Sequence, residues 1–382
     1  MGPHNRKSPE LLLKYGDIKA LYGAVTDKSE KSLSKSEQKR ASEFNLKKAQ
    51  KVMDYCAKNS VDIITLFDKR YPARLSGIYN PPMLLFCYGD ISCLEDSLSI
   101  TVVGARNPSQ YSVDVASRIC RSLSELGVVI VSGFALGIDS VAHGSALKSG
   151  GKTVAVLACG IDVKYPSANS KVKHVIAKGN GAVITEYLPG TRTRGEFFQN
   201  RNRILSGLSN GTLVIEASAE SGSLITAEHA VEQGRELFCI PPANLFDSRY
   251  SGVIKYIRDG AIPTFSHMDI VYEYYDYFTD KIAEDDRTYG LEDAKAEDIR
   301  INKHAEPKPA KEENTANEKA VETEDLGELQ KKIIEILSEK EANADELSAL
   351  TGEDISSILA ELTELEIFGY IKLTAGQRYT IN

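Results

Sequence analysis

The segment from Ile100 to Ala227 most constrains the fold, because short apolar runs alternate there with stretches of helical spacing. Five such runs are each followed by a turn that contains glycine, and they read ITVV, VVIV, TVAVLAC, AVIT and TLVIEA. Alternating strands and helices are typical of an α/β unit built on a mostly parallel sheet. The sequence therefore predicts a wound parallel sheet, whose strand order it does not reveal.

Ligands of such sheets bind beyond the carboxyl ends of the strands, so the turns there are the first candidates for a site. They comprise residues 104–106, 132–133, 159–160 and 216–223. The most basic segment nearby is TRTRGEFFQNRNR, residues 191–203, with four arginines and one glutamate. We expect this surface to bind a string of phosphates and not a single nucleotide.

The segments on either side divide the chain into four predicted parts. Residues 1–68 read as a small helical domain, and residues 69–278 hold the α/β core. Residues 279–325 are charged and poor in large apolar side chains, which predicts a flexible linker. Residues 326–382 read as three helices and a hairpin, the pattern of a winged helix. The lysine-rich helices of the first part are either a solvated face or an auxiliary phosphate-binding surface.

The third helix of the winged-helix segment is not typical of a duplex reader, which carries hydrogen-bond donors there. Its polar positions are mostly acidic: Glu353, Asp354, Ser356, Ser357, Glu361 and Glu364. We therefore favour a protein partner of the winged helix over duplex recognition.

The formal net charge of −8 does not exclude a nucleic-acid partner, because the acidic excess is local. Residues 280–325 hold 15 acidic and 8 basic side chains, which leaves 38 basic and 39 acidic elsewhere. No apolar run approaches the ~20 residues of a membrane helix, and no secretory segment opens the sequence. We expect a cytoplasmic protein without membrane contact, in which the six cysteines, none in a CxxC pair, stay reduced.

Two motifs after the first strands bear on ligand chemistry. Arg106 follows a strand and precedes a helix, where backbone amides and a guanidinium can bind phosphate. Asp139 is expected to cap the helix that carries His143, and a packed histidine is favoured over a metal ligand. No GxGxxG fingerprint follows a strand, and no metal or cofactor is predicted.

Two further segments contribute candidates later in the chain. Arg201 and Arg203 point in different directions on a helix, so one is expected to bind ligand while the other braces the fold. The segment 221–223, with Thr226, offers hydroxyls and amides at another helix start. No activated nucleophile is recognisable, which favours a protein that is not an enzyme. The alternative is a nucleotide hydrolase acting on nucleoside monophosphates, with Glu216 or Glu228 as its acid.

An ordered set of motifs between about residues 70 and 265 resembles the DNA-processing protein A family, DprA or Smf. The set comprises YPARLSGIYNPPMLLFCYG, VVGARNPSQY, VSGFALGIDSVAH, DVKYPSAN, EYLPGT, RNRILSGLS and VIEASAESGSLITAEHAVEQGRELFCIP. The resemblance implies a Rossmann-like core that binds single-stranded DNA, with a SAM-like helical domain before it and a winged helix after it. It also implies a homodimer that protects incoming strands in natural transformation and loads the RecA recombinase.

By position, the family's phosphate-binding arginine corresponds to Arg106, and its RNR segment to residues 201–203. This chain has Ser167 where many members have lysine, so Lys164 or Lys171 is expected to supply that charge. Its residues 250–254 depart from the family's SxGxN signature. The predicted nucleic-acid contacts are Gly104, Arg106, Ser132, Gly133, Lys164, Lys171, Arg201, Asn202, Arg203, Ser221, Gly222 and Ser223.

Overall fold

The computed structural model describes residues 8–43, 46–169, 171–179, 181–278, 327–367, 370–374 and 378–381. These residues belong to two compact units, one within residues 1–283 and one within residues 284–382. The segment predicted to be a charged linker, 279–325, lies outside the described residues. None of the described helices combines the length and the apolar character needed to cross a membrane.

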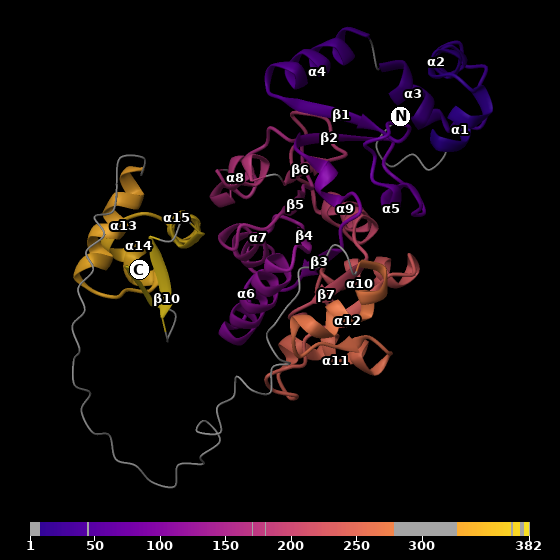
Figure 1. Ribbon diagram of the computed structural model, residues 1–382. Coiled ribbons are helices and arrows are strands. Elements are labelled where there is room, and N and C mark those ends of the chain that lie inside the picture. Colours follow the sequence, from indigo (N-terminus) through magenta and orange to yellow (C-terminus); the bar gives the residue numbers. More distant parts are fainter. Residues whose placement is uncertain are drawn as a thin grey trace, which may run out of the picture. The chain divides into compact units, whose positions relative to one another are not determined.

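A nine-stranded sheet forms the centre of the first unit, and its strands follow the spatial order β1-β2-β6-β5-β4-β3-β7-β8-β9 (Figure 1). Neighbouring strands from β6 to β9 pair in parallel, whereas β2 is antiparallel to both β1 and β6. The strands are β1 Val61–Thr65, β2 Leu84–Gly89, β3 Ser99–Val103, β4 Val129–Ser132, β5 Thr153–Val156, β6 Ala182–Thr185, β7 Gly211–Val214, β8 Glu236–Cys239 and β9 Ile262–Pro263. This sheet confirms the predicted wound α/β fold.

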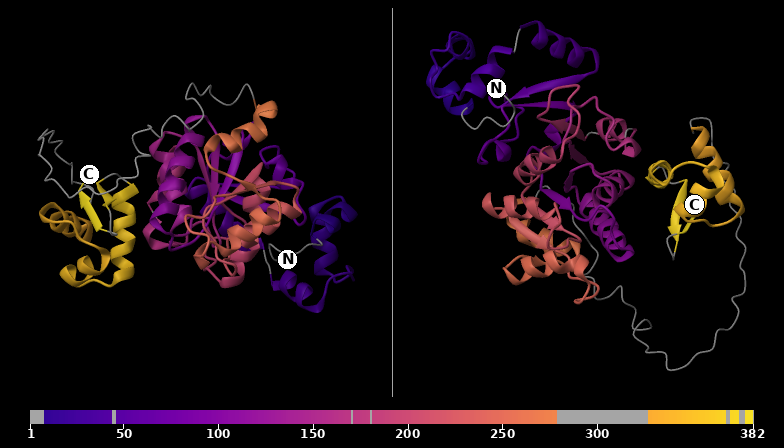
Figure 2. Two further views of the ribbon diagram at one scale, coloured as in Figure 1. Left: turned by 90° about the horizontal axis from the view of Figure 1, so that it is seen from below. Right: turned by 180° about the vertical axis from the view of Figure 1, so that it is seen from behind.

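Helices cover both faces of the sheet, and each face has its own apolar core (Figure 2). One core includes residues of α6 (Gln110–Glu125), α7 (Ile138–Lys148) and α12 (His267–Phe278). The other includes residues of α5 (Ala73–Ser76), α9 (Gly195–Leu208), α10 (Leu224–Glu232) and α11 (Ser251–Arg258). The strands between the two layers are apolar on both sides, which is why the sequence shows continuous apolar runs instead of alternation.

The order of strands reverses direction at β3. From β3 the chain proceeds outward through β4, β5 and β6, and it then returns through α9 to place β7 on the other side of β3. In wound sheets this switch point opens a crevice beyond the carboxyl ends of the two central strands. The segments after β3 and β7 are therefore brought together although about a hundred residues separate them in sequence.

Four helices precede the sheet in sequence: α1 Ser8–Tyr15, α2 Ile18–Thr26, α3 Lys35–Glu43 and α4 Leu46–Lys58. Leu11, Leu21, Val25 and Leu33 form a small separate core among the first of them. The predicted helical domain of residues 1–68 nevertheless includes β1, which pairs along its whole length with β2. The sequence VDIIT of β1 has no alternation of apolar and polar residues that would set it apart from the helical pattern before it.

The second unit has the predicted winged-helix elements, which are α13 Glu328–Glu339, α14 Ala344–Thr351, α15 Ile355–Ile367, β10 Ile371–Thr374 and β11 Arg378–Ile381. Two of the acidic residues assigned to its third helix have structural roles. Asp354 accepts hydrogen bonds from the backbone N and Oγ of Ser357, and Glu364 is buried. The predicted protein-contact role of this unit stays a prediction.

Candidate nucleic-acid interface

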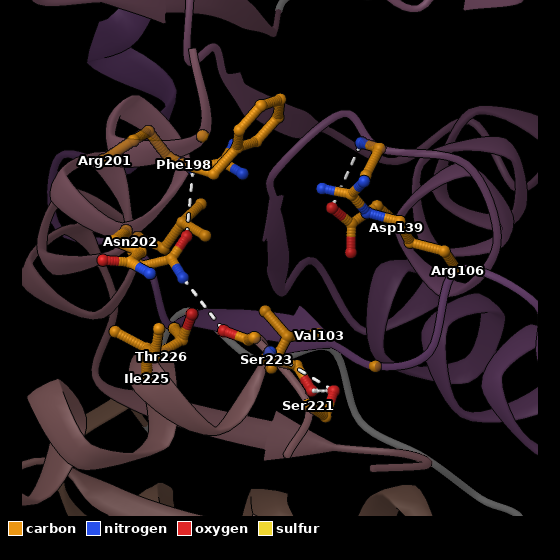
Figure 3. A pocket seen from close by; sticks show the side chains of 16 residues that line it. Val103, Arg106, Asp139, Phe198, Arg201, Asn202, Ser221, Ser223, Ile225 and Thr226 are labelled. Atoms are coloured by element: carbon orange, nitrogen blue, oxygen red, sulfur yellow. Dashed lines mark hydrogen bonds between the residues drawn. The ribbon is translucent and has the colours of Figure 1, made fainter. Parts of the chain in front are cut away.

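A pocket of about 470 Å³ lies at the switch point between β3 and β7. Its walls are the segment after β3, the start of α7, the inner face of α9 and the start of α10, and we call it the rim pocket. Figure 3 shows Asn202, Ser223 and Thr226 across the cavity from Arg106. Of the predicted contacts, seven line it: Gly104, Arg106, Arg201, Asn202, Ser221, Gly222 and Ser223.

Arg106 is the exposed cation at the mouth of the rim pocket. Its guanidinium carbon lies 5.1 Å from the centre of the Phe198 ring, a cation–π contact that orients the charge without neutralising it. The turn that carries Arg106 is held against the start of α7, because Ile138 N donates to Ala105 O at 3.2 Å. Gly137, with φ of 80°, permits this approach, since a Cβ there would collide with the carbonyl oxygens of Ala105 and Arg106.

Arg201 forms the inner wall of the pocket and is only 4% exposed. Its Nη1 donates to the carbonyl oxygens of Gly133 and Val156 at the carboxyl ends of β4 and β5. Its Nε donates to Oδ1 of Asn202 at 3.2 Å, and Nδ2 of Asn202 donates to Gly222 O at 3.2 Å. This chain of bonds ties α9 to the start of α10 and leaves the arginine's positive charge inside the pocket.

Hydroxyl groups line the pocket at the start of α10. Ser221 Oγ and Ser223 Oγ share a hydrogen bond of 2.7 Å. Thr226 is 1% exposed, and its Oγ1 has no hydrogen-bond partner among the described residues. These neutral groups can donate to phosphate oxygens, which suits a nucleic-acid backbone as well as a single anion.

The start of α6 is already supplied with a carboxylate from within the chain. Oε2 of Glu216, a residue 1% exposed, accepts from Ser109 N at 2.9 Å and from Ser109 Oγ at 2.7 Å. The helix dipole there stabilises this internal anion. From this turn, Gly104 and the side chain of Arg106 line the pocket. Neither Glu216 nor Glu228, the acids of the hydrolase alternative, lines the rim pocket.

Asp139 is the one carboxylate among the described residues that line the rim pocket. It was expected to cap α7, but the N-cap is Gly137, and Oδ2 of Asp139 accepts from Ala135 N at 3.1 Å within the first turn. Burial raises the pKa of Asp139, and the nearby Arg201 opposes that rise. With Asp139 ionised the two pocket arginines leave one net positive charge, and with it protonated they leave two.

His143, on the same helix as Asp139, is the packed histidine that the sequence predicts. It is 1% exposed, and its Nδ1 lies 2.7 Å from Oγ1 of Thr153, which itself donates to Ile130 O. Burial lowers the pKa of His143 to about 3, so the ring is neutral and donates from Nδ1. No three His, Cys, Asp or Glu side chains gather around a metal position in the described part of the chain.

Five predicted contacts lie outside the rim pocket. Ser132 is buried and donates to Val102 O, and a Cβ on Gly133 would collide with the Arg201 guanidinium, so both support the site from behind. Arg203 forms a buried ion pair with Glu186, at 2.7 Å between Nη2 and Oε2. Lys164 and Lys171 are exposed and line a different cavity.

Phe198, Asp139 and Gln199 are among the lining residues of the rim pocket that the sequence does not predict as contacts. Phe198 is not among the predicted contacts, yet it is half-buried and packs against both Arg106 and Tyr165. Asp139 is predicted only as a helix cap, and Gln199 is not among the predicted contacts. Helical spacing could have predicted that Phe198 lines the pocket, because it precedes Arg201 by three positions and so lies on the same face of α9.

The amino-acid sequence of this chain matches the models of a known protein family. The model of DNA recombination-mediator protein A matches residues 62–275, and that of the DprA winged helix domain matches residues 317–377. DNA processing protein DprA of Bacillus subtilis is 39% identical over 226 residues, 59% of this chain and 75% of that protein. Protein Smf of Synechocystis is 32% identical over 344 residues, 88% of this chain and 83% of that protein.

Solved structures agree with the sequence comparison. The structure of DprA from Streptococcus pneumoniae matches with a TM-score of 0.61 and 34% identity, covering 71% of this chain and 93% of that one. DprA from Helicobacter pylori, whose structure is described as showing a single-stranded DNA binding mode, matches with a TM-score of 0.50 and 31% identity over 54% of this chain and 94% of that one. The chain therefore belongs to the DprA/Smf family of DNA-processing proteins.

Proposed function

We propose that the rim pocket binds the sugar-phosphate backbone of single-stranded DNA, without chemical conversion of the strand. The observation that carries the proposal is Arg106, an exposed guanidinium held over Phe198 at the mouth of a pocket lined by hydroxyl groups. A cation beside an aromatic face and neutral donors is the arrangement by which proteins bind single strands with little sequence preference. The single-stranded DNA binding mode described for the Helicobacter pylori relative supports a single-stranded DNA ligand for this chain as well.

The burial and the hydrogen-bond partners of the predicted contact residues indicate which of them can touch a DNA strand. We propose that Arg106 and the start of α10 contact phosphate directly, with Arg201 adding charge from the inner wall. Arg203 is proposed to brace α9, because its guanidinium is already paired with Glu186. Among the described residues of the pocket there is one carboxylate, Asp139, which accepts a backbone hydrogen bond. This inventory favours binding over hydrolysis of a nucleotide.

At the level of the cell, we propose that the chain protects incoming DNA and loads the RecA recombinase onto it during natural transformation. We also propose a cytoplasmic homodimer. Family membership supports these roles, and the dimer has further support in two exposed apolar side chains near α11: Leu245 is 69% exposed and Phe246 is 95% exposed. Light scattering of the purified chain, native and with Phe246→Ser, measures the dimer directly.

Replacement of Arg106 tests the proposal most directly. Arg106→Ala should weaken binding of a labelled oligonucleotide in fluorescence anisotropy, since a phosphate contact is lost. Across a salt series the slope of log affinity against log salt should become shallower by about 0.7, the value for one phosphate contact on a single strand. Arg118→Ala, which removes an exposed arginine of α6 outside the pocket, is the matched control. Superimposable curves for Arg106→Ala and the native chain would refute the site.

A further inference from the structure

A second cavity, of about 380 Å³, lies where the end of α4 and β2 meet α8 (Val172–Lys178), and we call it the α4–α8 groove. Aromatic and cationic side chains line it together: Tyr55, Tyr88, His174, Lys164, Lys171 and Lys173. They come from three segments that are remote in sequence. The groove is separate from the rim pocket, with which it shares no lining residue.

The aromatic side chains of the groove are held in place by the fold. The Tyr88 and His174 rings meet edge to face, with centroids 5.4 Å apart, and the Tyr88 hydroxyl hydrogen-bonds to Nδ1 of His174. Tyr55 is half-buried at the end of α4 and also lines the groove. Rings fixed at the edge of a cavity offer flat faces and edges against which a nucleobase can pack. Because the fold already holds these rings in place, binding a base loses little additional side-chain entropy.

The charge of the groove is positive. Its one carboxylate among the described lining residues, Asp162, accepts from Gly190 N at 2.8 Å. Lys173 donates to Val163 O at 2.7 Å and so shapes the loop, whereas Lys164 and Lys171 are exposed. The helix α4 adds four exposed lysines against one aspartate: Lys47, Lys48, Lys51, Lys58 and Asp54.

The segment that carries Lys164 also reaches the rim pocket. Tyr165, the next residue, packs edge-on against Phe198 with centroids 5.7 Å apart, and Phe198 lies beneath Arg106. Aromatic and cationic groups therefore continue from Arg106 through Phe198 and Tyr165 to Lys164. A solvated basic helix face, the other interpretation of the amino-terminal lysines, requires neither this continuity nor a cavity with aromatic walls.

We propose that the α4–α8 groove holds a further nucleotide of the strand bound in the rim pocket, with its base against Tyr55 or Tyr88 and its phosphate at Lys164 and Lys171. This inference rests on the proposed function and extends its footprint onto the amino-terminal helices. A nucleotide in the groove should add affinity only for strands long enough to reach it from the rim pocket.

The absence of tryptophan from the chain permits a specific test. Tyr55→Trp places a single tryptophan in the groove and retains an aromatic ring, and Tyr22→Trp places one on α2 (Ile18–Thr26), outside both cavities. Oligo-dT of about 16 nucleotides should quench the Tyr55→Trp emission, and oligo-dT of about 4 nucleotides should not, these lengths spanning common single-strand site sizes. Emission from Tyr22→Trp should stay unchanged with both.

Affinities separate this inference from the proposed function. Lys164→Ala should weaken binding of the long strand about threefold or more and leave the short strand unchanged, as expected for loss of one phosphate contact. Arg106→Ala should weaken both. Unquenched Tyr55→Trp emission with the long strand, or equal losses for both lengths in Lys164→Ala, would overturn the groove while leaving the rim pocket intact. Equal quenching by free dTMP and by the long strand would also overturn it, by showing a separate mononucleotide site.

Discussion

Asp139 is the residue that sets the charge of the rim pocket. It lies beside Arg201, which is buried, and it accepts a hydrogen bond from Ala135 N. Burial raises the pKa of the Asp139 carboxyl, because water no longer stabilises the ionised form, while Arg201 acts in the opposite direction. Lowering the pH toward the raised pKa protonates the carboxyl and removes the one negative charge that faces a bound phosphate.

Strand affinity should therefore increase as the pH is lowered toward the raised pKa of Asp139. Asp139→Asn should bind more tightly than the native chain at pH 8, by on the order of 1 kcal/mol or about fivefold, and should lose most of the increase at low pH. Anisotropy titrations at constant ionic strength measure both effects. Asp114→Asn, an exposed carboxylate on α6, should behave like the native chain. A native affinity that falls on acidification, with Asp139→Asn following it, would show that this carboxyl does not control the pocket.

Among the elements, α9 joins the pocket wall to the fold. Its apolar residues Ile204, Leu205 and Leu208 are buried in the core on one face of the sheet. Arg201 and Arg203, in the helical turn just before them, point toward different segments of the chain. Arg203 reaches Glu186, directly after β6, and its Nε donates to Asn80 O at 3.0 Å. Helix α9 thus presents Arg201 to the rim pocket, while Arg203 ties the helix to two segments distant in sequence.

Loss of the Arg203 side chain should destabilise the fold more than it alters the site chemistry. The side chains of Arg203 and Glu186 are 8% and 1% exposed, so Arg203→Ala leaves a buried carboxylate without its cation. The expected loss is about 3–5 kcal/mol of unfolding free energy, or about 10 °C in melting temperature. Circular dichroism melts measure it, with Arg106→Ala as a control that should melt like the native chain. An unchanged melt for Arg203→Ala would mean that the ion pair does not brace α9.

At the scale of the whole molecule, the acidic excess and the surface proposed to bind phosphate occupy different parts of the chain. The overall charge is −8, yet the rim pocket and the α4–α8 groove are each positive. Because exposed charges farther apart than about 8 Å are largely screened at physiological salt, we expect the local surface to govern strand binding. In the winged helix, Asp354 caps α15 and Glu364 is buried, and the exposed Glu353 before α15 is acidic where a duplex reader has donors.

Deletion of residues 327–382 should therefore leave oligonucleotide affinity within about twofold of the native value, a change below 0.5 kcal/mol. Binding of a partner protein through the winged helix should be lost in the same variant. Anisotropy gives the first quantity, and co-purification of the native and shortened chains with candidate partners gives the second. A large fall in strand affinity after deletion would assign the winged helix to DNA.

The amino-acid sequence by itself determined the α/β core, the winged helix and the turns that carry the candidate contacts. These features depend on local patterns: continuous apolar runs, helical spacing and glycine where the backbone turns sharply. Departures arose where the pattern was short or its partner distant. The strand β1 and the two-residue β9 are such cases, since edge strands gain their order from neighbours elsewhere in the chain.

Only the tertiary structure decided which of the similar residues line the rim pocket. Arg201 and Arg203 are equivalent in sequence, but Glu186 and Asn80 neutralise and hold one of them, while the other lines the pocket. The switch between β3 and β7, and the placement of Lys164 in a second cavity, likewise depend on contacts between remote segments. Burial and pairing of a charge are properties of its surroundings in three dimensions, and a linear pattern does not contain them.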